Sequence, residues 1–105
     1  MALGYIYVLS NPSMAGLLKI GYTCVSVEKR AKELSISTGV PVGFIVEYFH
    51  ISEDVEEIET LVHAELGQQR VNENREFFRA SVSEAVAAIE RFIRQPTVNF
   101  IRNEN

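Results

Sequence analysis

Hydrophobic side chains along this sequence fall into short runs whose period changes from one segment to the next. Residues 4–9 and 17–22 are rich in β-branched and aromatic side chains, which predicts two buried strands. A turn signal at residues 10–13, Ser-Asn-Pro-Ser, lies between them, and so short a connection favours an antiparallel pair. A third strand is expected at residues 44–51 and a short extended segment at residues 76–79.

Three other segments have the three- and four-residue spacing of amphipathic helices. Ser26 is the expected N-cap of the first helix, which should run to about Ser35. Ser52 is the expected cap of the second helix, and Gly67 its end. The third should begin at Ser81, because a glutamate follows three positions later in the pattern of a capping box.

The order of these segments is strand, strand, helix, strand, helix, short strand, helix. It predicts an α+β domain in which a small, mostly antiparallel sheet of three to four strands is flanked by helices. A chain of 105 residues is the size of one domain, which we assign to residues 1–95. Residues 96–105 are expected to form a C-terminal tail that is loose or engaged with a partner.

Acidic side chains are unevenly distributed along the chain, whose net charge is −4. Residues 53–105 contain eleven acidic and six basic side chains, whereas residues 1–52 contain three acidic and four basic ones. A nonspecific nucleic-acid-binding protein usually has a basic face, so the net charge argues against that class. Outside one acidic cluster the chain is slightly basic and can still provide a local phosphate-binding face. The cluster consists of Glu53, Asp54, Glu56, Glu57 and Glu59.

The amino-acid composition also limits which metal ions the protein could bind and in which cellular compartment it is expected. The single cysteine, Cys24, excludes an intramolecular disulfide and fits a reducing compartment. One cysteine and two histidines do not make the usual structural zinc site, so a catalytic metal would depend on carboxylates, which favours Mg²⁺ or Mn²⁺. The sequence shows neither the roughly 20-residue apolar run of a membrane span nor a signal-peptide pattern. We therefore expect a cytoplasmic protein with no membrane partner.

Polar side chains on the first two strands and the first helix are the first candidates for chemistry. Tyr5 and Tyr7 are two positions apart on a strand and so share one face of the sheet. Lys19 is on the neighbouring strand. Arg30 projects from the helix that follows, where a guanidinium can grip phosphate through two parallel hydrogen bonds.

The second helix contributes two more groups. Glu59 and His63 are four positions apart and lie on one helix face. A carboxylate for a divalent cation, cations for the phosphate charge and a tyrosine hydroxyl for the nucleophile suffice for metal-assisted hydrolysis of a phosphodiester.

The spacing of these residues resembles that of the GIY-YIG nuclease superfamily. Tyr-Ile-Tyr occupies residues 5–7, Lys-Ile-Gly occupies residues 19–21, and Arg30 follows nine positions beyond the glycine. The small phage-type branch of that superfamily is similar over five segments in the same order, and the resemblance covers about residues 4–90. They are Gly-Tyr-Ile-Tyr-Val-Leu-Ser-Asn-Pro, Leu-Leu-Lys-Ile-Gly-Tyr-Thr, Glu-Lys-Arg-Ala-Lys-Glu-Leu, Thr-Gly-Val-Pro and Arg-Glu-Phe-Phe.

The resemblance implies a GIY-YIG nuclease-like fold and a role for four residues. Tyr7 matches the tyrosine that contacts or deprotonates the attacking water, and Arg30 the arginine that stabilises the phosphate in the transition state. Glu59 matches the glutamate that holds the single divalent metal, Mg²⁺ or Mn²⁺. Glu76, in the Arg-Glu-Phe-Phe segment, is a second acidic metal candidate typical of the branch.

Two positions depart from the motifs that give the superfamily its name. Tyr5 stands where the first motif has glycine, and Lys19 stands where the second has tyrosine. The phage-type branch often shows both changes, so they leave the expected fold unchanged. A lysine can bind phosphate or lower the pKa of a water, but it does not replace a phenol. The catalytic candidates are therefore Tyr7, Arg30, Lys19, Tyr5 and His63.

Three functions remain open on the sequence alone. The first is a metal-dependent endonuclease acting on DNA, with specificity supplied by a homodimer or a second protein. The second is a nucleic-acid-binding or structure-recognition module without efficient cleavage, which the net charge and Lys19 favour. The third is a protein-interaction domain that docks through the acidic helix face at residues 53–57.

Overall fold

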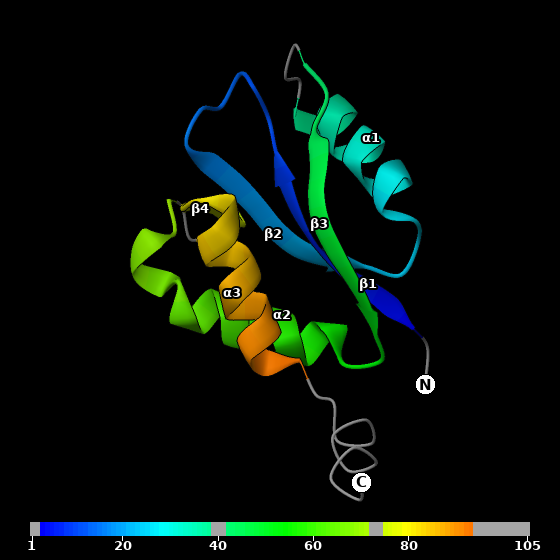
Figure 1. Ribbon diagram of the computed structural model, residues 1–105. Helices are drawn as coiled ribbons and strands as arrows, with labels where there is room; N and C mark the ends of the chain where they lie inside the picture. The colour runs from blue at the N-terminus through cyan, green and yellow to red at the C-terminus, as the bar shows by residue number, and fades with distance from the viewer. Residues whose placement is uncertain (1–2, 39–41, 72–74, 94–105) are drawn as a thin grey trace, which may run out of the picture.

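The computed structural model describes residues 3–38, 42–71 and 75–93. Within these ranges the chain forms an antiparallel four-stranded sheet flanked by three helices, which confirms the predicted α+β class (Figure 1). The predicted tail at residues 96–105 lies outside the described residues. In chain order the elements are β1 (Gly4–Ser10), β2 (Leu17–Thr23), α1 (Val27–Thr38), β3 (Ile45–Ser52), α2 (Val55–Glu65), a 3₁₀ turn (Gly67–Gln69), β4 (Phe77–Arg79) and α3 (Val82–Phe92).

The sheet has the order β3-β1-β2-β4, so the first two strands lie in its centre. Tyr7 stands opposite Gly21 of β2 and Phe49 of β3, and every pairing is antiparallel. The edge strand β4 pairs only with residues 17–19 of β2. Beyond Lys19 only the Ile20 amide still bonds to this segment, through the Glu76 carbonyl at 3.1 Å, which leaves the Ile20 carbonyl available to groups from other elements.

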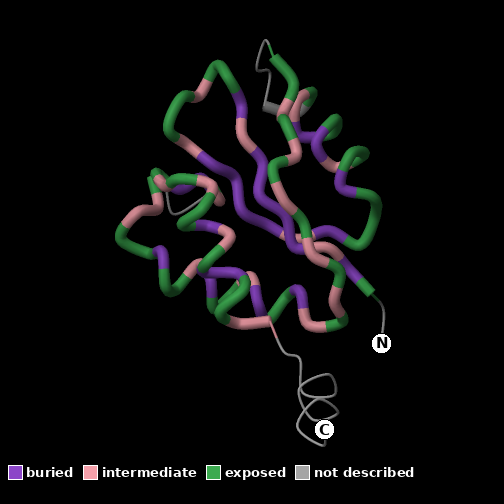
Figure 2. Tube along the Cα trace, viewed as in Figure 1, coloured by how far each residue is buried: buried purple, intermediate pink, exposed green. Residues whose placement is uncertain are grey.

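Each face of the sheet has its own hydrophobic cluster. One cluster joins Ile6, Val8 and Ile20 to the buried side of α2 and α3. The other joins Tyr7 and Leu9 to α1. Figure 2 shows the buried residues along β1 and β2, while β3 at the sheet edge alternates between intermediate and exposed positions.

The start of α1 is confirmed, and its end is later than the prediction of Ser35. The hydroxyl of Ser26 accepts a hydrogen bond from the Lys29 amide at 3.2 Å. The helix continues to Thr38, and within it the Ser35 hydroxyl donates to the Ala31 carbonyl at 2.8 Å. Ser35 is thus accommodated within the last turns and does not stop the helix.

The other two helices test the remaining cap predictions. The prediction that Ser52 caps α2 is wrong, because Ser52 still pairs with Gly4 as the last residue of β3, and Asp54 takes the N-cap position. Helix α2 ends at Glu65, before the predicted Gly67, and the 3₁₀ turn follows. The capping box that begins α3 at Ser81 is present as predicted.

Among the described residues, no helix is long and apolar enough to cross a membrane.

Candidate functional site

Tyr7 and Arg30 meet on the face of the sheet that α1 covers. Tyr7 is in the middle of β1 and is only 1% exposed. The packing of α1 through Val27 and Ala31 onto the same cluster carries the Arg30 guanidinium to the side of the Tyr7 hydroxyl. Burial raises the pKa of Tyr7 above its ordinary value, and the Arg30 contact offsets this only in part. Tyr7 is therefore a neutral phenol near neutral pH, held against a cation.

Lys19 lies on the same face, where it is paired with Glu76. The Lys19 ammonium is 3.4 Å from a carboxylate oxygen of Glu76 and 5.3 Å from the centre of the Phe77 ring. Lys19 is 8% exposed, and this burial lowers its pKa, while the Glu76 carboxylate opposes the shift. Glu76 itself is held in place through its carbonyl, which accepts a hydrogen bond from the Ile20 amide at 3.1 Å.

Gly21 provides the space in which these groups meet. A Cβ atom at this position would lie 2.7 Å from the Tyr7 hydroxyl oxygen and 2.8 Å from a Glu76 carboxylate oxygen. Both distances are shorter than real Cβ contacts. The absence of a side chain at Gly21 therefore lets the Tyr7 phenol and the Glu76 carboxylate lie over the β2 backbone.

A second set of groups reaches the site from α2. Glu59, His63 and Glu76 each offer one ligand atom, and these atoms lie within 4.8 Å of one another. His63 is held on two sides: Nε2 is 2.8 Å from the Ile20 carbonyl oxygen, and the ring packs on Phe78 with 4.9 Å between centroids. The open edge of β2 beyond β4 is what allows an α2 side chain to reach the Ile20 carbonyl.

The two glutamates of this set interact electrostatically. Burial, the charge of Glu76 and a hydrogen bond to Glu76 raise the pKa of Glu59 to about 7. Near neutral pH the Glu59 carboxyl is therefore partly protonated in the absence of a cation. Bringing two carboxylates together in this way leaves a position that a divalent cation can occupy in place of the proton.

The structure brings together most of the residues that the sequence singled out. Around Gly21 lie the side chains of Tyr7, Lys19, Arg30, Glu59, His63 and Glu76. Tyr5 is on the same face, one cross-strand pair away, and its ring packs edge-on against Phe49 with 5.8 Å between centroids.

One cation near the site was missed from the sequence. Arg70 lies over the Phe78 ring at 5.7 Å, and its charge acts to lower the pKa of Glu59. A hydrogen bond of 3.0 Å from its Nε to the Arg75 carbonyl holds it there. Arg70 lies between the second predicted helix and the short extended segment at residues 76–79, where no local pattern marks it as a neighbour of Glu59.

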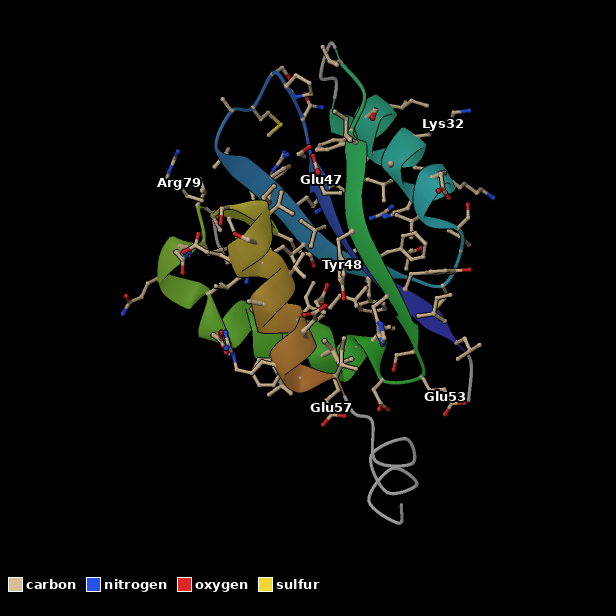
Figure 3. The ribbon with its side chains drawn as sticks, viewed as in Figure 1. Lys32, Glu47, Tyr48, Glu53, Glu57 and Arg79 are labelled. Carbon is tan, nitrogen blue, oxygen red and sulfur yellow. The ribbon has the colours of Figure 1, made fainter. Side chains whose placement is uncertain are left out.

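The acidic face predicted at residues 53–57 lies at the start of α2. It lines a shallow hollow of about 340 Å³ together with Thr60. Figure 3 shows Glu53 and Glu57 at the lower edge of the molecule, pointing away from the sheet. Four of the five residues of the acidic cluster thus line this outer hollow, while Glu59, the fifth, turns toward β2 and Glu76.

Comparison with known proteins adds the family. No curated protein and no solved structure matches the chain. A family model described as the T5orf172 domain matches residues 4–93, which takes in all of the strands and helices described above. This domain is of phage type and is associated with nuclease-like modules. The chain therefore belongs to the T5orf172 domain family, as a phage-type, nuclease-like domain.

Proposed function

We propose that this domain is a metal-dependent endonuclease of the GIY-YIG type, which hydrolyses phosphodiester bonds in DNA. The observation that carries the proposal is the meeting of a phenol, a guanidinium and a pair of carboxylates around Gly21. These are the groups that a phosphodiester needs for placement of water, for phosphate charge and for a divalent cation. The family membership supports a nuclease-like role and a DNA partner.

Arg30 is suited to hold the scissile phosphate. It is partly exposed, with 39% of its side-chain surface accessible, so a phosphate can reach it from solvent. Its described partners are the Tyr7 hydroxyl and the Glu33 carboxylate, the latter at 3.6 Å. A phosphate can compete for the guanidinium, since a two-pronged contact with an anion is stronger than a contact with a neutral phenol.

Tyr7 is suited to position the attacking water. Because its pKa is raised, it acts as a neutral hydroxyl near neutral pH. With the Arg30 guanidinium beside its oxygen, the phenol keeps its own proton and can donate it to a water beside the phosphate. This places the nucleophile by orientation, and proton abstraction by a Tyr7 phenolate is not required.

Glu59 and Glu76 are the residues that would hold Mg²⁺ or Mn²⁺. Their carboxylates fit a divalent cation, because they come together from separate elements and the closeness of Glu76 raises the pKa of Glu59 when no cation is present. The ion would supply Lewis acidity and a more acidic bound water. Lys19, held by Glu76, adds a second cation on the same side of the sheet.

The test is a nicking and cleavage assay on supercoiled, linear and branched DNA with Mg²⁺ or Mn²⁺. The parent should cut in the presence of either ion, and Glu59→Gln should abolish cutting. Arg30→Lys should lose about a hundredfold or more in rate, because an ammonium does not reproduce the two-pronged contact. Its stability should change by less than about 0.5 kcal/mol, as is usual for partly exposed helix positions.

Lys32→Gln is the matched control on the same helix. Lys32 is exposed and points outward from α1 (Figure 3), so its removal should leave cutting unchanged. Equal cutting by the parent and Arg30→Lys would reduce Arg30 to a solvated cation. A parent that cuts nothing but binds DNA with a steep salt dependence would instead be a nucleic-acid recognition module.

A further inference from the structure

We infer that His63 is a third metal ligand, and that Glu59, His63 and Glu76 together select a transition-metal ion such as Mn²⁺ over Mg²⁺. The inference concerns the metal site of the proposed nuclease. The inference rests on the proposed function only because both use Glu59 and Glu76. Its own subject is which ion binds and through which atoms.

The three side chains have the placement of a metal centre. Glu59 and His63 are one helical turn apart on α2, and Glu76 comes from the segment that leads into β4. One ligand atom from each lies within 4.8 Å of the other two. All three residues are partly buried, so the groups are shielded from bulk solvent yet can be reached by an ion.

The contact between His63 and Ile20 is a second observation that points to a ligand. A carbonyl oxygen only accepts hydrogen bonds, so Nε2 carries the ring proton in its 2.8 Å contact with the Ile20 oxygen. The lone pair of a neutral His63 is then on Nδ1. Histidines that bind metals usually donate their other ring N–H to a carbonyl or carboxylate, which fixes the tautomer and the ring orientation.

The ring is also prevented from turning away. Phe78, which is fully buried, packs on it at 4.9 Å. The Ile20 carbonyl is free to accept from His63 because β4 pairs with β2 only as far as Lys19. Because β4 is short, the His63 ring can reach the edge of β2 and is oriented there by its hydrogen bond to the Ile20 carbonyl.

An imidazole in the ligand set changes which ion is preferred. Mg²⁺ favours six oxygen ligands in octahedral geometry and usually keeps several waters, so it would use the two carboxylates and gain little from a nitrogen. Mn²⁺ and the later first-row ions bind imidazole more readily, in an order that rises from Mn²⁺ toward Cu²⁺. The nitrogen of His63 should therefore strengthen Mn²⁺ binding and leave Mg²⁺ binding nearly unchanged.

The rival explanation is that His63 only ties α2 to the edge of β2. The substitution His63→Gln separates the two, because a glutamine amide can still donate to the Ile20 carbonyl but has no imidazole lone pair. His50→Gln is the matched control, since the chain has two histidines and His50 lies on β3 opposite Ile6, away from the three ligands.

The experiment is calorimetric titration of the full chain with Mn²⁺ and with Mg²⁺, without DNA. The parent should bind Mn²⁺ at least about tenfold more tightly than Mg²⁺. His63→Gln should lose about tenfold or more in Mn²⁺ affinity, which is typical of an impaired histidine ligand, and keep its Mg²⁺ affinity within about twofold. His50→Gln should match the parent for both ions.

Pulsed EPR of the bound Mn²⁺ provides a readout that a merely structural role would not give. The parent and His50→Gln should show coupling to an imidazole nitrogen, and His63→Gln should not. Should His63→Gln fail to fold, as judged by thermal unfolding without metal, the nitrogen coupling of the parent against His50→Gln decides the matter alone.

Three results would overturn the inference: no nitrogen coupling in the parent, equal affinities for the two ions, or unchanged Mn²⁺ affinity in a folded His63→Gln. Failure of the proposed nuclease function looks different. Nitrogen coupling without DNA cutting would support the metal site and contradict the proposed nuclease activity. Cutting with Mg²⁺ and no nitrogen coupling would support the nuclease activity and contradict the role of His63 as a ligand.

Discussion

Gly21 has no side chain, and this lets the groups of the site lie directly against the β2 backbone. An alanine there would place its Cβ 2.7 Å from the Tyr7 hydroxyl oxygen and 2.8 Å from a Glu76 carboxylate oxygen. The buried Tyr7 ring has little room in which to adjust, so the new Cβ of Gly21→Ala should push the Tyr7 hydroxyl and the Glu76 carboxylate out of their positions. We expect DNA cutting to fall about a hundredfold, the usual cost of misplacing reacting groups by an ångström. Overpacking should lower the unfolding free energy by about 1–3 kcal/mol.

Gly67→Ala is the control for this prediction. A Cβ at Gly67 would meet nothing within 4 Å, so cutting should be unchanged and stability should shift by less than about 0.5 kcal/mol. Rates and urea unfolding of the two variants are the measurements. If Gly21→Ala cuts as fast as Gly67→Ala, the close packing of Tyr7 and Glu76 over β2 has no part in the chemistry.

Individual site residues differ in how far the sequence could reveal them. The positions of Tyr7, Arg30 and Glu59 followed from strand alternation, helix spacing and the resemblance to a nuclease family. The position of Arg70 did not, because it depends on how the chain leaves the 3₁₀ turn and crosses Phe78. The bond from His63 to the Ile20 carbonyl was equally hidden, since it joins residues 43 positions apart.

At the scale of the elements, helix starts with a local signal were predictable. Ser26 and Ser81 both accept a hydrogen bond from an amide three positions ahead, and both lie outside any strand. Ser52 has the same residue type, but it is held in the β3 ladder opposite Gly4, so its hydroxyl only reaches the Asp54 amide. Strand pairing, which is not local, decided that case.

The capping box of α3 gives a prediction at this scale. In Ser81→Ala the Glu84 amide loses its acceptor at 3.1 Å, and we expect the unfolding free energy to fall by about 1 kcal/mol. Urea unfolding should show a lower midpoint with an unchanged slope, because the surface exposed on unfolding stays the same. Metal affinity should not change, since α3 contributes none of the three ligands.

Ser83→Ala is the comparison, at an exposed position in the first turn of the same helix. It caps no amide in the box and should stay within about 0.5 kcal/mol of the parent. Equal losses in the two variants would mean that the box contributes nothing beyond an ordinary surface serine.

At the scale of the whole molecule, the site depends on groups from both sides of the sheet. Tyr7 and Arg30 belong to the face covered by α1, whereas Glu59 and His63 come from the helix that covers the opposite face. They meet because β4 ends its pairing at Lys19 and leaves the edge of β2 open. The sequence indicated a short fourth strand, but only the assembled sheet shows that its shortness lets the two halves of the site join.

The contact between Glu59 of α2 and Glu76 also makes the stability of the whole domain depend on pH. In the metal-free protein the pKa of Glu59 is about 7, above its ordinary value of 4.5, first because of burial and then because of Glu76. Between these two values the folded state keeps a proton that the unfolded state has released. The stability linked to this proton is therefore complete below pH 4.5 and is lost as the pH rises through 7.

We expect the unfolding free energy of the metal-free parent to fall from about pH 5 to about pH 7.5, and Glu59→Gln, which does not ionise, to lose this part of the slope. Urea unfolding in EDTA at several pH values measures it, with Glu53→Gln as the control for removing one exposed carboxylate. Mn²⁺ should reverse the trend, because the ion takes the place of the proton and binds more tightly as Glu59 ionises. Parallel pH profiles for the parent and Glu59→Gln would show that Glu59 does not keep a proton in the folded state, and would remove the argument that a cation replaces it.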